Sequence, residues 1–144
     1  MTNTYQNPSV QFLYPDGWQL DETRNQDGVT LNLQSPYSMF LILNYYDKPM
    51  AACELADEAL QTMADEYPDL DSNPISETIA DQSAVGHDLN FFSLDLTNTC
   101  WIRALTSKKQ AVLIFAQTSD LDLERGESAF RGVCASLRLG GAKK

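Results

Sequence analysis

Short runs of alternating apolar and polar residues dominate the first third and the last half of the chain. Residues 28–34 (GVTLNLQ) place an apolar side chain at every second position, which is typical of a half-buried strand. Residues 10–14 form a shorter run of the same kind, and residues 39–46 are apolar at both parities, as in a central strand. The pattern predicts further strands at 75–80, 85–96, 99–106 and 111–118.

Two segments have the period of an amphipathic helix. Within residues 51–67 the apolar positions from Ala56 onward recur at i+3, i+4, i+7, i+8 and i+11, and acids cover the opposite face. Pro68 ends this helix, because proline cannot continue the hydrogen-bond ladder. A second helix is expected over 120–138, with buried positions at Leu123, Phe130, Val133, Cys134 and Leu137.

The order of elements is therefore strand pairs, a helix, a three-strand meander and a closing helix. Short links between consecutive strands favour antiparallel pairing. We expect an α+β fold, with a mainly antiparallel β-sheet flanked by two principal helices. The length of 144 residues fits a single domain over 1–144, with flexible ends at 1–8 and 140–144.

A tryptophan directly after a turn is the most distinctive local feature. Pro15 suits the second position of a β-turn, and Gly17 can take a positive φ. Trp18 then begins a returning strand. We expect this turn to fold the ring back onto the sheet, so that it closes one edge of the core.

The charge balance excludes several classes of partner. Twenty acids and ten bases give a net charge of −10, so the chain has no basic footprint for nucleic acid, and anionic membrane surfaces are disfavoured. No window has the length of apolar sequence that a membrane span needs. The N-terminal residues lack the pattern of a signal peptide, so a cytoplasmic location is expected.

Candidate catalytic and metal-binding residues are few. Cys53, Cys100 and Cys134 are widely spaced and fit free thiols in a reducing compartment. His87, the single histidine, stands beside Asp88, but neighbours on a strand point to opposite faces. Residues 69–74 begin like a calcium loop, yet Pro74 replaces its required glycine. We expect no metal, no cofactor and no enzymatic activity.

The meander offers a candidate binding surface. If residues 97–99 form a three-residue turn, the side chains of Phe92, Leu94 and Leu96 fall on a dry face. The opposite face is then mixed in polarity, and it is either a binding surface or the rim beneath a helix layer. The same register places Asp95 diagonal to Arg103 and predicts an ion pair. The candidate binding residues are Phe91, Ser93, Asp95, Trp101 and Arg103.

The element order and the turn Pro15-Asp16-Gly17-Trp18 resemble the PsbP-like family. That group includes an extrinsic photosystem protein, DcrB-type bacterial proteins and a Ran-binding nuclear import factor. The resemblance implies an antiparallel sheet flanked by helices, usually without enzymatic activity. Some bacterial relatives resemble chaperone-adaptors that cradle secreted effectors.

Three hypotheses for function follow. The first is a non-enzymatic domain of a bacterial cytoplasm that binds a protein partner through one sheet face or its acidic helix, as a monomer or homodimer. The second is a chaperone-adaptor that cradles an apolar segment of a secreted effector, which an uncovered apolar face would favour. The third is a small enzyme that uses His87, which a pocket joining His87 to a carboxylate or thiol would favour.

Overall fold

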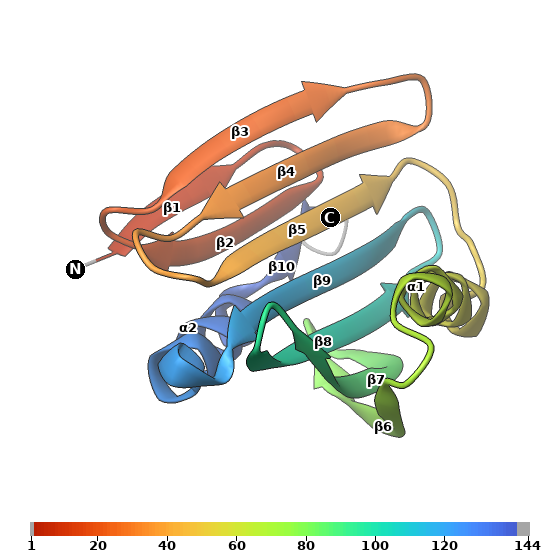
Figure 1. The fold of residues 1–144 in the computed structure, drawn as a ribbon. Helices are drawn as coiled ribbons and strands as arrows, with labels where there is room; N and C mark the ends of the chain where they lie inside the picture. The colour runs from red at the N-terminus through yellow and green to blue at the C-terminus, as the bar shows by residue number, and fades with distance from the viewer. Residues whose placement is uncertain (1, 141–144) are drawn as a thin grey trace.

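The computed structural model describes residues 2–140, and its largest element is a seven-stranded antiparallel sheet (Figure 1). The strand order is β3-β4-β5-β9-β8-β7-β6, so the edge strands are β3 and β6. The bounds of these strands are β3 Gln19–Arg24, β4 Gly28–Gln34, β5 Phe40–Tyr46, β6 Asp71–Ile79, β7 Gln82–Ser93, β8 Leu96–Thr106 and β9 Ala111–Ser119.

A second, three-stranded sheet joins the two ends of the described chain. It has the order β1-β2-β10, with bounds Thr2–Gln6, Val10–Pro15 and Arg138–Leu139. The prediction of a flexible end over 1–8 does not hold for residues 2–6, which pair with β2 along their whole length, and residue 1 lies outside the described residues. At the other end, the backbone N–H of Gly140 donates to the carbonyl of Ser9 at 2.6 Å, and the rest of the predicted flexible tail, 141–144, lies outside the described residues.

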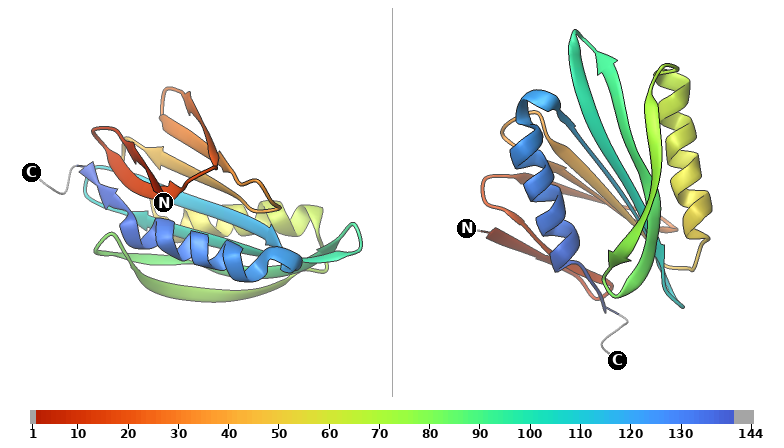
Figure 2. Two further views of the ribbon diagram at one scale, coloured as in Figure 1. Left: turned by 90° about the vertical axis from the view of Figure 1, so that its left-hand side faces the viewer. Right: turned by 90° about the horizontal axis from the view of Figure 1, so that it is seen from below.

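Two helices cover opposite faces of the large sheet (Figure 2). Helix α1 (Ala52–Glu66) packs on β7, β8 and β9. Helix α2 (Leu123–Ser136) follows the 3-10 turn η1 (Asp120–Asp122) and packs on the other face together with β2. This arrangement confirms the predicted α+β class and places both helices within two or three residues of their predicted bounds.

The core has two parts because the central strand β8 contributes to both faces of the sheet. On the α2 side, the ring of Trp101 stacks on Phe130 with centroids 5.0 Å apart. On the α1 side, Cys100 and Ile102 pack among residues of α1 such as Leu55. Residues 99–105 are consequently all buried, which leaves the middle of this strand no free surface.

The turn between β7 and β8 differs from the predicted one. It consists of Leu94 and Asp95, with Ser93 paired to Leu96, and both turn residues have positive φ, at 53° and 63°. Residues 97–99 lie within β8. The prediction placed the turn at Asn98 because asparagine tolerates a left-handed conformation more readily than leucine does. Moving the turn shifts the pairing by an odd number of residues, and this exchanges the two faces of β7 relative to β8.

Trp18 closes one edge of the core, as predicted. Gly17 has a φ of 88°, and the N–H of Trp18 donates to the carbonyl of Pro15 at 3.4 Å. The indole is buried in the cluster on the α2 side and meets the ring of Tyr37 edge-on at 6.2 Å. The turn therefore ties the chain entering β3 to the loop between β4 and β5.

Removal of this ring tests its role. We expect Trp18→Ala to lower the free energy of unfolding by about 3–5 kcal/mol, because a cavity replaces a buried ring. Trp18→Phe retains an aromatic ring and should lose clearly less. Urea denaturation followed by circular dichroism measures both variants. An unchanged midpoint for Trp18→Ala would contradict the assignment.

Candidate functional site

The predicted binding residues do not share one face. Phe91 lies on the α1 side, where its ring stacks on Tyr67 with centroids 4.3 Å apart. Trp101 and Arg103 lie on the α2 side and are buried. Ser93 is half-buried and Asp95 is exposed in the turn. The predicted common surface is thus wrong in its geometry. A binding role for these residues stays a prediction, with only Ser93 and Asp95 of the set reaching solvent.

Arg103 forms a buried ion cluster beneath α2. Its Nε donates to Glu77 of β6, and its Nη1 lies 2.8 Å from a carboxylate oxygen of Asp88 on β7. Arg131 of α2 reaches the same Glu77 at 3.1 Å. The predicted ion pair between Asp95 and Arg103 is wrong, because Asp95 lies in the turn between β7 and β8. The carboxylate diagonal to Arg103 is that of Asp88, the residue opposite Trp101.

The ion cluster holds strands β6, β7 and β8 and helix α2 together. The Arg103 side chain is fully buried, and its Cζ lies 5.5 Å from the centroid of the Phe130 ring. Burial raises the pKa of Glu77, but hydrogen bonds and charge from Arg103, then Arg131, outweigh this and hold the pKa below its ordinary value. A lowered carboxyl pKa stabilises the fold above the pKa of the unfolded chain, and this contribution disappears as the pH falls through the folded-state pKa.

A cleft between α1 and strands β6 and β7 brings together the residues that an enzyme hypothesis requires. Nε2 of His87 lies 3.0 Å from Oδ1 of Asp57. Both residues line a cleft of about 470 Å³, and the exposed thiol of Cys53 lines the same cleft. Sequence reasoning missed this association, because a strand and a helix 30 residues apart in the chain meet here only through tertiary packing.

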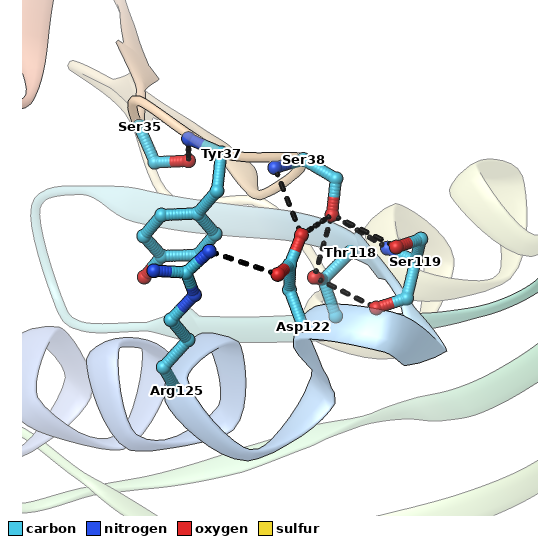
Figure 3. A network of polar contacts seen from close by, with 7 residues as sticks. All are labelled: Ser35, Tyr37, Ser38, Thr118, Ser119, Asp122 and Arg125. Carbon is cyan, nitrogen blue, oxygen red and sulfur yellow. Dashed lines mark hydrogen bonds and ion pairs between the residues drawn. The ribbon is translucent and has the colours of Figure 1, made fainter.

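A polar network fastens the loop between β4 and β5 to the start of α2 (Figure 3). The hydroxyl of Ser38 donates to Asp122 at 2.6 Å, and the N–H of Ser119 donates to the Ser38 hydroxyl at 3.1 Å. Arg125 pairs with Asp122 at 2.9 Å and lies over the Tyr37 ring, 3.8 Å from its centroid. Hydrogen bonds from Ser38, then from Arg125, lower the pKa of Asp122. These contacts join the loop between β4 and β5 to η1 and α2.

Exposed apolar side chains gather at one end of the molecule. We call Phe92, Leu94, Leu96 and Leu121 the apolar end; they are exposed by 65, 93, 39 and 79%. The first three surround the turn between β7 and β8, and Leu121 belongs to η1. The two segments are neighbours because Asn98 pairs with Ser119, and both views in Figure 2 place them at the same end. Among the described residues, Leu13 on β2 is the other exposed large apolar side chain.

Two hollows adjoin the apolar end. One, of about 830 Å³, includes Leu121 and the polar network residues Tyr37, Asp122 and Arg125 in its lining. The other, of about 360 Å³, includes Phe92 and the segment 66–70 after α1. The prediction that Phe92, Leu94 and Leu96 form a dry face is wrong, because Leu96 pairs with Ser93 and therefore lies on the opposite face of the hairpin from Phe92, and all three side chains are exposed. Asp95 was the sequence signal that could have placed the turn at residues 94–95, because aspartate tolerates a left-handed conformation.

A metal site, a membrane-spanning helix and reactive buried thiols find no support within residues 2–140. No group of three or more His, Cys, Asp or Glu side chains there is arranged to hold a metal ion. No helix in that part of the chain has the length and apolar character needed to cross a membrane. Burial raises the pKa of the thiol of Cys134 to about 12, and it raises that of Cys100 further, so these two thiols are unreactive at neutral pH.

Comparison with known proteins identifies the fold. No family model matches the chain, and no curated protein matches it at a significant level. Among solved structures, the cyanobacterial PsbP protein CyanoP of Synechocystis sp. PCC 6803 is similar with a TM-score of 0.67 and 14% identity over 96% of this chain and 92% of that one.

Two further structures have the same architecture. LpqN of Mycobacterium tuberculosis, a protein involved in cell envelope biogenesis, has a TM-score of 0.60 and 10% identity over 96% of this chain and 90% of that one. PA94 of Pseudomonas aeruginosa, a protein of unknown function, has a TM-score of 0.53 and 14% identity over 90% and 91%. The chain therefore has a PsbP-like fold, which confirms the resemblance at the level of architecture. At these identities the neighbours define the fold and assign no partner or activity.

The buried ion cluster yields a stability prediction. We expect Arg103→Met to lower the free energy of unfolding by about 3–5 kcal/mol, because it leaves the carboxylate of Asp88 without a cation and that of Glu77 with Arg131 alone. Arg131→Met removes a half-exposed partner of the same Glu77 and should cost only about 0–1 kcal/mol. Urea denaturation at neutral pH compares the two variants. Equal losses would show that burial of Arg103 does not set the strength of the cluster.

Proposed function

We propose that this chain is a non-enzymatic domain that binds a protein partner through the apolar end. The observation that carries the proposal is the concentration of Phe92, Leu94, Leu96 and Leu121 on two adjacent segments, with up to 93% of a side chain exposed. Soluble proteins scatter such side chains singly, and several of them gathered at one end of a molecule are typical of an interaction surface.

The backbone at Leu94 supports this proposal. A two-residue hairpin turn with positive φ at both positions favours Asn or Gly, and a left-handed conformation costs a bulky residue about 1–2 kcal/mol. The hairpin between β6 and β7 has the same geometry at Ala80 and Asp81, with φ values of 54° and 63°, and uses a small residue. Leu94 benefits neither the turn nor the core, so contact with a partner is the role that remains for its side chain.

The remaining open surface gives less support to the chaperone-adaptor hypothesis. Helix α1 leaves uncovered the part of its sheet face that β3, β4 and β5 form (Figure 1). There Phe40 and Ile42 are half-buried, and Phe40 stacks on Phe115 at 6.1 Å, while Asn32 and Gln34 beside them are exposed. A face of this mixed polarity fits a cradle for an apolar segment less well than the apolar end fits a docking partner.

The setting of the protein stays a prediction. Three free cysteines, two of them buried, fit a reducing compartment such as the bacterial cytoplasm. The acidic surface favours neither nucleic acid nor an anionic membrane as partner. A monomer and a homodimer are both compatible with the proposal.

Substitution of Leu94 tests the proposal. Leu94→Asn suits the turn, so we expect it to fold at least as stably as the wild type while it loses affinity for the partner. Leu13→Asn, the matched change at an exposed leucine on β2, should leave affinity unchanged. A partner captured from extracts of the native cell is identified by mass spectrometry, purified, and titrated against each variant by calorimetry. Equal affinity for Leu94→Asn and wild type would refute docking at the apolar end.

A second candidate function is thiol chemistry in the cleft of Cys53, His87 and Asp57. The observation that favours it is the hydrogen bond between His87 and Asp57 beside an exposed thiol. A histidine held by a carboxylate is the usual means of activating a cysteine nucleophile. The observed hydrogen bond joins His87 to Asp57 and does not include the thiol of Cys53, so the binding function has the stronger support.

Alkylation kinetics separate these two functions. In the native protein we expect iodoacetamide to modify Cys53 alone, since Cys100 and Cys134 are buried. If Cys53 is an ordinary surface thiol, His87→Gln leaves its alkylation rate at pH 7 unchanged, and this is the result we expect. A rate that falls about tenfold or more in His87→Gln would instead support an activated nucleophile. Mass spectrometry of timed samples provides the rates.

A further inference from the structure

We propose that the partner segment recognised by the apolar end carries apolar side chains flanked by lysine or arginine. This inference rests on the proposed protein-binding function and specifies the chemistry of the partner. It follows from the charges that surround the exposed leucines and from the two hollows beside them.

Acidic side chains surround the apolar end. Three chain segments meet there: residues 66–72 after α1, residues 92–99 around the hairpin turn, and residues 119–125 at the start of α2. Arg125 is the only base in these three segments. The acids that they contribute are Glu66, Asp69, Asp71, Asp95, Asp120, Asp122 and Glu124.

Several of these carboxylates are available to a partner. Asp122 and Asp120 are engaged within the fold, by Ser38 and Arg125 and by the hydroxyl of Thr99, respectively. Asp95 and Glu124 are exposed and make no hydrogen bond or ion pair with other residues of the range 2–140. Arg125 pairs with Asp122 and lies over the Tyr37 ring, and it forms no ion pair with Asp95 or Glu124 within residues 2–140. The surface presented to a partner is therefore apolar in its projecting side chains and negative around them.

This charge pattern distinguishes among occupants. A second copy of the chain would bring its own net charge of −10 against the same acids, and a vesicle of anionic lipid would repel them. A segment with cations beside its apolar residues would instead gain from both features. The hollows that include Phe92 and Leu121, of about 360 and 830 Å³, offer places for the apolar side chains of such a segment.

Titration with synthetic peptides tests the inference without knowledge of the native partner. Two 16-residue amphipathic peptides share one pattern of leucines and differ only in lysine or glutamate at the flanking positions. The full chain, labelled with ¹⁵N, is titrated with each peptide while amide shifts are recorded. We expect the lysine peptide to shift amides of residues 92–97 and 119–122, and the glutamate peptide to cause no shift there.

Two variants assign the contact to the apolar end. Leu94→Asn should weaken binding of the lysine peptide about tenfold, since burial of a leucine contributes roughly that factor or more. Asp95→Asn should weaken it by a smaller factor, and added salt should reduce this difference. Leu13→Asn is the control for loss of an exposed leucine elsewhere, and it should bind as the wild type does.

Three results would overturn the inference. Shifts confined to the acidic face of α1 would show non-specific attraction to a negatively charged protein. Equal binding of the two peptides would show that charge plays no part. Co-sedimentation with vesicles of zwitterionic lipid, with no binding of either peptide, would identify a membrane surface as the occupant. If the native partner still requires Leu94 while the lysine peptide fails to bind, the inference fails and the proposed function stands; if the native partner binds Leu94→Asn normally, the proposed function fails.

Discussion

The buried guanidinium of Arg103 is the constraint on which the arrangement of the C-terminal half depends. A charge without access to water is tolerated only where opposite charges and hydrogen bonds surround it. Here the partners come from separate elements: Glu77 from β6, Asp88 from β7, and the Phe130 ring from α2. Arg131 of α2 adds a second cation that pairs with the same Glu77. Satisfying one buried charge therefore fixes the edge strand, its neighbour and the covering helix relative to one another. Its Nη2 finds no acceptor within residues 2–140, so the cluster favours a specific arrangement more than maximal stability.

Burial on both faces of β8 determines where the molecule can interact. Trp101 and Arg103 face α2, whereas Cys100, Ile102 and Ala104 face α1, so the centre of the sheet is enclosed. What remains accessible is the part of the sheet beyond α1, the edge strands and the two ends. Of these, the end with the β7–β8 turn alone gathers exposed leucines and phenylalanine among the described residues. An enclosed centre with a projecting apolar hairpin is compatible with a binding domain on a PsbP-like fold.

The turn between β6 and β7 and the turn between β7 and β8 have the same backbone geometry, but their first residues differ in exposure. Ala80 and Leu94 occupy equivalent left-handed positions. Ala80 is partly buried against the core, whereas Leu94 projects into solvent. The cost of the left-handed conformation is offset by packing in the first case and by nothing within the described chain in the second. This contrast, together with the acids around Leu94, is the reason to regard that turn as a contact surface.

Local patterns in the sequence are sufficient to predict the elements and the fold class. Alternation at 28–34, the 3.6-residue period at 51–67 and the turn before Trp18 are local signals, because they arise from side-chain spacing along one segment, and the structure confirms them. Tertiary packing sets the register of β7 on β8, the strand formed by residues 2–6, the partners of Arg103 and the contact between His87 and Asp57. Each of these depends on which distant segments share a face. In an antiparallel pair the side chains repeat every two residues, so a turn placed three residues away, at 97–99 instead of 94–95, reversed every assignment of face that followed from it.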